Sequence, residues 1–135
     1  IIVTLLSLFF TQLHIHHLFV ILYSVLITAT LFSLGGFINA VFAKSFDDIS
    51  IVPTFILTPL TYLGGVFYSI ENLSPFFQTA SLFNPIVYMV NTFRYGILGV
   101  SDVNIGFSLA VMTLGTIALY WYALRLLSSG RGMKE

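Results

Sequence analysis

The chain has 135 residues, of which 58% are hydrophobic and only 7% are charged, and its mean hydropathy is +1.01. Soluble domains carry about 25% charged residues, so this composition predicts an integral membrane protein. Five basic and five acidic residues balance, which argues against nucleic-acid binding through a basic surface. The lack of cysteine excludes disulfides, thiolate metal sites and a cysteine nucleophile within these residues.

The chain opens with Ile inside an apolar run over residues 1–13. This run is shorter than the roughly 20 residues that span a bilayer, so we expect the end of a helix that starts upstream. No basic segment precedes the run and no small-residue cleavage site follows it, which argues against a signal peptide. We therefore expect residues 1–135 to be one transmembrane domain, the C-terminal part of a longer protein.

Three uncharged stretches, residues 18–43, 49–70 and 103–124, are long enough to cross a membrane. The predicted fold class is an all-α, polytopic helical bundle with the end of one span and three full spans. Residues 44–48 leave room only for a tight hairpin, in which Ser45 or Asp47 can cap the next helix.

The region over residues 72–101 is ambiguous. Residues 76–98 could be taken as a span, but Gln78, Asn91 and Arg94 would then lie in lipid, where each unsatisfied polar group costs roughly several kcal/mol. Two short helices, re-entrant or interfacial, fit better before the last span. Whether the region crosses stays open.

The second of these short helices is predicted to be amphipathic and to begin at Pro85 with Asn84 as its cap. Its apolar face comprises Ile86, Met89, Val90, Phe93 and Ile97, and its polar face Asn84, Tyr88, Asn91 and Tyr95.

The basic tail, with Arg125, Arg131 and Lys134, predicts a cytoplasmic C-terminus. If residues 72–101 do not cross, Lys44 joins this side, giving four basic residues inside against Arg94 outside. If they cross, the count is three against one, so charge alone does not decide the topology.

Residues 59–85 open like a span, break at two prolines and contain the pair Gly64-Gly65. Non-helical backbone at membrane depth requires surrounding protein or a water-filled path, so this segment indicates a transport path rather than an anchor. Pro53 and Pro59 interrupt the predicted 49–70 span, and Thr54, Thr58 and Thr61 lie close enough to bond carbonyls that proline frees. This kinked helix either lines a path or simply packs against neighbours.

Several smaller patterns have a structural and a functional interpretation. Gly35-Gly36, with Asn39 and Ala40, favours close helix contact over a path-lining role.

His14, His16 and His17 lack acidic or cysteine partners, which favours an interfacial turn over a metal site. Asp47-Asp48 favours a helix start over paired acid–base carboxylates. Glu71 and Arg94 are expected to lie near each other, paired or facing water.

No ionisable residue lies in the middle of the three predicted spans, which argues against a proton- or ion-coupled carrier. No G-x-x-x-x-G-K-[ST] motif is present, so these residues do not bind ATP by that device. A transporter of this composition is expected to take its energy from a separate ATPase subunit. No catalytic, cofactor-binding or metal-binding residue is predicted in this chain, and it is not expected to be an enzyme.

Residues 37–99 carry a combined pattern: Pro59-Leu-x-x-Leu-Gly-Gly-x-Phe67-Tyr68, then Leu73-Ser-Pro75, then Asn84-Pro85 opening a helix. This pattern resembles the C-terminal half of ABC type-2 transporter permeases of the YadH-like branch, the transmembrane subunits of bacterial ATP-driven exporters. The resemblance implies six spans, both termini inside, and an extended connection between the fifth and sixth spans in the outer leaflet.

The resemblance further implies a permease homodimer in the lipid bilayer of the bacterial cytoplasmic (inner) membrane, working with an ATP-binding cassette ATPase that carries ATP and Mg²⁺. The main coupling element is then expected upstream, and Lys44, Asp47 and Asp48 form at most a minor ATPase contact. The residues proposed for the translocation path and outer gate are Asn39, Thr54, Thr58, Pro59, Gly64, Gly65, Tyr68, Glu71, Asn84, Tyr88, Asn91 and Arg94.

Two other classes remain open. One is a channel or secondary carrier that is not coupled to ATP. The other is an integral membrane enzyme acting on lipid or glycan, for which the sequence offers no nucleophile–base arrangement. The transported substrate stays undetermined, since hydroxyl, amide and aromatic residues suit an amphipathic or polysaccharide-linked lipid and a drug equally well.

Overall fold

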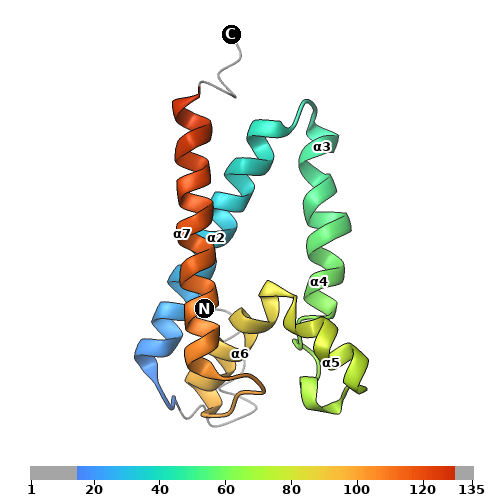
Figure 1. Cartoon of the computed structure of the whole chain (residues 1–135), viewed down its shortest axis with the longest axis vertical. Helices are drawn as coiled ribbons and strands as arrows, with labels where there is room; N and C mark the ends of the chain where they lie inside the picture. Colours follow the sequence, from blue (N-terminus) through green and yellow to red (C-terminus); the bar gives the residue numbers. More distant parts are fainter. Residues whose placement is uncertain (1–14, 130–135) are drawn as a thin grey trace, which may run out of the picture.

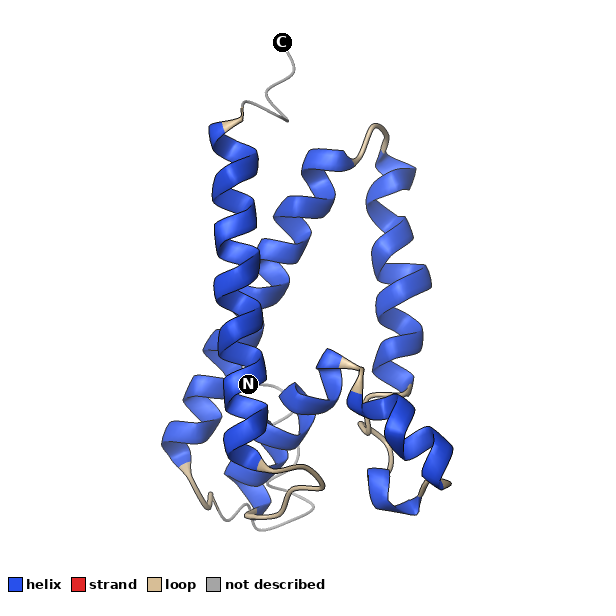
Figure 2. Ribbon diagram, viewed as in Figure 1, coloured by secondary structure: helices blue, strands red, loops and turns tan. Residues whose placement is uncertain are grey.

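The computed structural model describes residues 15–129, and all regular structure in that range is helical, with no strand (Figures 1 and 2). The elements are α2 (Leu18–Phe42), α3 (Phe46–Ile51), η1 (Val52–Leu57), α4 (Thr58–Tyr62), η2 (Ile70–Asn72), α5 (Pro75–Leu82), α6 (Pro85–Leu98) and α7 (Ile105–Ser128). The predicted helix end at residues 1–13, His14, Arg131 and Lys134 lie outside the described residues.

The helices α2 and α7 are the two elements of the described range that are long and apolar enough to cross a membrane. They confirm helices close to the predicted 18–43 and 103–124. The last helix begins at residue 105 because the Asn104 side chain caps it, accepting the Phe107 N–H at 3.0 Å. It continues past residue 124 to Ser128, and the Arg125 guanidinium in its last turn lies over the Trp121 ring, 3.5 Å from its centroid.

The third predicted span differs from the expectation. The chain is helical from α3 through η1 to α4, but the helix ends at Tyr62 rather than near residue 70. Gly65 then takes a φ of 73°, a left-handed conformation that glycine adopts at little cost and other residues avoid. A third full span is therefore not confirmed. We call α3, η1 and α4 together the arm.

The two short helices predicted before the last span are present as α5 and α6. Each begins with proline at its first position, and the Asn84 side chain accepts the Ile86 N–H at 3.0 Å, so the predicted cap is confirmed.

Three helices form the packed body of the molecule: α2, α6 and α7 lie against one another, and α6 crosses beneath the other two in Figure 1. The core is Tyr88, Met89 and Met112, with Ile27 and Leu31 packed against it. The arm contacts mainly its own neighbours along the chain and stands beside the body, joined to α2 by a hairpin. We refer to the hairpin end and the α6 end of the molecule.

The hairpin has the capping box expected of its sequence. Asp48 N–H donates to Ser45 Oγ at 3.3 Å, and the Asp48 carboxylate accepts the N–H groups of Lys44 and Ser45 at 2.9 and 3.1 Å. The hydrogen bond from the Lys44 backbone is the main reason that the pKa of Asp48 lies below its ordinary value. Ser45 is therefore the cap that the sequence left open between Ser45 and Asp47.

The start of α2 sits on the last turn of α6 at Gly96. The Gly96 carbonyl accepts the N–H groups of His16 and His17 at 3.1 and 2.8 Å. A Cβ at Gly96 would lie 2.5 Å from Ile21 Cγ1 and 3.1 Å from the Ile21 backbone nitrogen, so only glycine allows this approach.

We therefore expect Gly96→Ala to lower the free energy of unfolding by about 1–3 kcal/mol, because the methyl group overpacks the α2–α6 contact. Denaturation in mixed micelles, followed by circular dichroism, measures the change. Gly115→Ala is the matched control, since a Cβ there would lie 3.9 Å from Leu31 Cδ1, an ordinary contact. Equal stability of the two variants would contradict the close packing at Gly96.

Candidate functional site

At the α6 end, one ion pair joins three segments of the chain. Arg94 Nη1 lies 3.0 Å from Asp102 Oδ2, and the two side chains are only 19% and 12% exposed. Arg94 Nη2 donates to the carbonyls of Gly65 at 2.5 Å and Tyr68 at 3.5 Å. Asp102 also accepts the Ile70 N–H at 2.8 Å. The pair thus ties α6 to the loop before α7 and to the segment that leaves the arm.

The environment of Asp102 favours its ionised form. Burial raises its pKa, but hydrogen bonds from the Ile70 backbone, the Ser69 side chain and Arg94, together with the positive charge of Arg94, outweigh this effect. The net result is a pKa below the ordinary value of 3.8. Asp102 is therefore a carboxylate at neutral pH and a suitable partner for a partly buried guanidinium.

A buried amide fixes the same loop from the other side. Asn91 is fully buried, and its Oδ1 accepts the Asp102 N–H at 2.8 Å and the Ser101 hydroxyl at 3.3 Å. Its Nδ2 donates to the Val87 carbonyl at 2.9 Å. Tyr88, also buried, donates its hydroxyl to Leu82 at 2.5 Å. Both predicted path residues thus lie inside the protein and bond to main chain.

Asn84 connects α6 to the arm. Its Oδ1 caps α6, and its Nδ2 donates to the Leu60 carbonyl at 2.6 Å. The Leu60 carbonyl lies in the last turn of α4, where it has no partner within the helix. The Asn84 side chain therefore both caps α6 and satisfies a free carbonyl in the last turn of the arm.

The glycine pair brings the arm close to α6. A Cβ at Gly64 would lie 2.8 Å from Ile86 Cγ2, and Gly65 has the positive φ that turns the chain out of the helix. Tyr68, just beyond the turn, donates its hydroxyl to the Tyr62 carbonyl at 3.0 Å. The two glycines allow the arm to approach α6 closely and allow the chain to turn sharply at the end of the arm.

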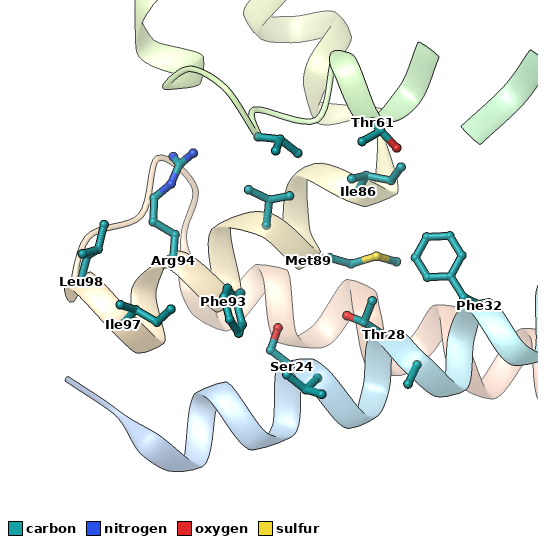
Figure 3. Close-up of a pocket in the computed structure, with 14 residues that line it drawn as sticks. Ser24, Thr28, Phe32, Thr61, Ile86, Met89, Phe93, Arg94, Ile97 and Leu98 are labelled. Atoms are coloured by element: carbon teal, nitrogen blue, oxygen red, sulfur yellow. The ribbon is translucent and has the colours of Figure 1, made fainter. Parts of the chain in front are cut away.

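An apolar cavity of about 790 Å³ lies between α2, the exit of the arm and α6. Figure 3 shows Ser24 and Thr28 on α2 across from Phe93 and Met89 on α6, with Met89 extending toward Phe32. All five residues of the predicted apolar face of α6 line this cavity: Ile86, Met89, Val90, Phe93 and Ile97. The polar face of α6 therefore packs inside the body, whereas its apolar face lines the cavity.

The remaining proposed path residues lie apart from this junction. Thr54, Thr58 and Pro59 are exposed on the arm. Thr58 Oγ1 bonds the Pro53 carbonyl at 3.0 Å, but this carbonyl also accepts the Thr58 N–H and is not one of those that proline frees, at Ile49 and Phe55. Thr61 likewise bonds Leu57 at 2.8 Å.

Asn39, Lys44, Asp47 and Asp48 all lie at the hairpin end, far along the chain from the junction. Asn39 Nδ2 donates to the Ile49 carbonyl at 2.8 Å and so ties α2 to the arm there.

Of the two alternatives for Glu71 and Arg94, pairing is wrong, because Arg94 pairs with Asp102 instead, whereas Glu71 is exposed and faces water. The junction at the α6 end therefore comprises Gly64, Gly65, Tyr68, Asn84 and Arg94 of the predicted residues, together with Asp102. From the sequence alone, no role was assigned to Asp102. The sequence feature that could have revealed the role of Asp102 is Gly99. With a φ of 74°, Gly99 ends α6 and turns the chain back toward Arg94.

Gly96 was also missed, because a single glycine in a helix gives no sign of which partner approaches it. Within residues 15–129, no group of three or more His, Cys, Asp or Glu side chains is placed to hold a metal ion.

Removing either charge of the ion pair is expected to destabilise the fold. Asp102→Asn or Arg94→Gln should each lower the free energy of unfolding at pH 7 by about 1–3 kcal/mol, since the partner then loses a charge-assisted hydrogen bond. Because the pKa of Asp102 is lowered on folding, its contribution is present above pH 3.8 and is lost as the pH falls through the folded-state pKa.

Unfolding titrations between pH 2 and pH 7 test this prediction. The wild type should lose more stability toward acid than Asp102→Asn. Glu71→Gln, at an exposed position, is the control and should change stability by less than about 0.5 kcal/mol. If the wild type and Asp102→Asn had the same pH profile, the role given to the ion pair would be wrong.

Comparison with known proteins places this geometry in a family. Residues 1–98 match the family described as ABC-2 type transporter. The whole chain is 51% identical over 135 residues to the inner membrane transport permease YadH of Escherichia coli (strain K12), covering 53% of that protein. Over 88 residues, 65% of this chain, it is 25% identical to nodulation protein J of Rhizobium leguminosarum bv. viciae, covering 34% of that protein.

No solved structure matches the chain. The chain spans about half the length of the permease YadH that it matches over its whole extent. The matched residues 1–98 include the arm, the glycine turn and α6, so the junction described above falls almost entirely within the family's shared region. The chain belongs to the ABC-2 type transporter family.

Proposed function

We propose that this chain forms part of the permease subunit of an ATP-driven exporter in the bacterial inner membrane, where a separate ATPase subunit supplies the energy. Family membership and identity to a transport permease support the class. The middle of α2 and of α7 carries no charged side chain, so these helices offer no relay of the kind that ion-coupled carriers use. The 135 residues also contain no P-loop motif.

The observation that carries the proposal is the junction between the arm and α6. Side chains, rather than a packed core, hold the arm there: Asn84 bonds Leu60, and Arg94 bonds Gly65. Where the junction opens to an aqueous path, such bonds to main-chain carbonyls can exchange for bonds to water, whereas buried apolar packing has no such replacement. The junction is thus suited to open and close, and we assign it as the gate of the transport path.

The arm contains a segment suited to bending. Its centre, η1, is a π-helix in which the Thr58 N–H bonds the Pro53 carbonyl. Short π-helical segments are frequent at functional sites, and proline weakens the preceding turn. Bending at η1 would move the α4 end of the arm relative to α6 without disturbing the hairpin.

We infer that this gate lies on the outer face. The basic residues Arg125, Arg131 and Lys134 favour a cytoplasmic C-terminus, which puts the α6 end outside and the hairpin inside. Two permease copies and two ATPase subunits then form the transporter, and ATP binding biases the permeases between two packings. Lys44, Asp47 and Asp48 form a minor ATPase contact at the hairpin end.

Coupling to an ATPase predicts nucleotide-dependent behaviour. The ATPase encoded beside the permease should co-purify with the tagged complete permease, and substitution of the lysine in its P-loop should abolish ATP hydrolysis by the complex. Proteoliposomes loaded with the dye calcein serve as the counter-test. Nucleotide-independent release of the dye, without a co-purifying ATPase, would indicate a channel and overturn the proposal.

The gate assignment predicts that Asn84→Ser loosens the junction selectively. Serine still caps α6 but is too short to reach the Leu60 carbonyl, so the variant removes one hydrogen bond worth about 1 kcal/mol, or about fivefold in the opening equilibrium. A cysteine in place of Ser81, which is 4% exposed and lies beside Leu60 and Asn84, should then react about fivefold faster with a membrane-impermeant maleimide.

The control for this experiment is Thr79→Ala, which removes an exposed side-chain bond on α5 away from the junction. Its labelling rate should equal that of the parent. An unchanged rate in Asn84→Ser would show that the Asn84–Leu60 bond does not hold the gate closed.

A further inference from the structure

Asn39 joins two helices at the hairpin end. It lies in the last turn of α2, and its Nδ2 donates to the Ile49 carbonyl of α3 at 2.8 Å. The chain is helical from α3 straight into η1, and carbonyls inside a helix are normally paired with an N–H of the same helix. A donor from another helix is needed at Ile49 only if the helical donor is missing.

The missing donor is the N–H of residue 53. In an α-helix the Ile49 carbonyl would accept the N–H four residues further on, but that residue is Pro53, which has no N–H. The regular pattern does not resume at once, because the Pro53 carbonyl pairs with the Thr58 N–H, five residues on, within η1. Pro53 therefore frees the Ile49 carbonyl, and the Asn39 amide satisfies it.

We propose that Asn39 and Pro53 act together as a clamp that pins α3 to α2. Proline creates a free carbonyl on one helix, and the asparagine of the neighbouring helix binds it. In apolar surroundings there is no water to take the place of this donor, so the bond is kept. Asn39 is thus a positioning residue, and its role depends on the proline 14 residues further along the chain.

The clamp also determines where the arm bends. The hairpin between α2 and α3 is closed by the Ser45–Asp48 capping box, so the hairpin, α3 and the end of α2 form one unit (Figure 1). At its other end the arm is held by the Asn84–Leu60 bond. When that bond opens, bending falls on η1, the first segment after the clamp. This role as a pivot rests on the proposed gate, whereas the clamp itself does not.

A double-mutant cycle in the complete protein tests the clamp. Asn39→Leu keeps the size of the side chain and removes the donor, so it should lower the melting temperature by about 2–4 °C. Pro53→Ala supplies an N–H for the Ile49 carbonyl within the helix. In that background Asn39→Leu should lower the melting temperature by less than about 1 °C. Equal losses in the two backgrounds, or no loss in either, would overturn the clamp.

The matched control is Thr30→Ala, also on α2. Thr30 Oγ1 donates to the Leu26 carbonyl at 2.8 Å, a bond that lies within α2 and does not involve the arm. Its effect on the melting temperature should be the same with and without Pro53→Ala. A background dependence as large as that of Asn39→Leu would mean that Pro53→Ala alters the whole bundle, and the clamp would then be rejected.

Spin-label distances test the pivot separately. Nitroxides at Leu22 on α2 and Ile51 on α3, two half-exposed positions, report how firmly α3 is held. Asn39→Leu should broaden their distance distribution with or without Pro53→Ala, because the alanine N–H satisfies the carbonyl but does not restore the bond to α2. An unchanged distribution would show that other contacts hold α3 and would overturn the pivot, while leaving the gate at Asn84 unaffected.

Discussion

The need to satisfy main-chain polar groups where helices break governs the α6 end of this chain. In water a free carbonyl bonds to solvent, but in an apolar environment an unpaired carbonyl costs roughly several kcal/mol of free energy. A chain that leaves a helix there must therefore supply hydrogen-bond partners. Here the partners are long polar side chains from α6: Asn84 takes the Leu60 carbonyl, and Arg94 takes the Gly65 carbonyl. The fold of residues 63–85 follows from these donors, because the segment can run only where they reach it.

Using arginine as such a donor creates a second requirement. A guanidinium that is 19% exposed needs a counter-charge, and Asp102 provides it while also accepting the Ile70 N–H. Asn91 in turn holds the Asp102 backbone, so the loop before α7 cannot shift without breaking a buried amide contact. The hydrogen bonds that satisfy the end of the arm thereby also hold the loop before α7 in place.

Local chemistry explains which features could be predicted from the sequence. Hydropathy located α2 and α7, and the Asn84-Pro85 and Ser45–Asp48 signatures located two helix starts, because these signals act within a few residues. The end of the arm was missed because hydropathy does not register a positive φ at Gly65. The partner of Arg94 was missed because Glu71 and Asp102 carry the same charge, and only the turn at Gly99 decides which one lies nearby.

The contacts at the junction differ in how readily they exchange, and this bears on any motion of the arm. Arg94 has one ionic partner, which is also anchored by Asn91, and carbonyl partners on the segment that leaves the arm. Movement of the arm therefore costs least if it breaks the carbonyl bonds and leaves the ion pair intact.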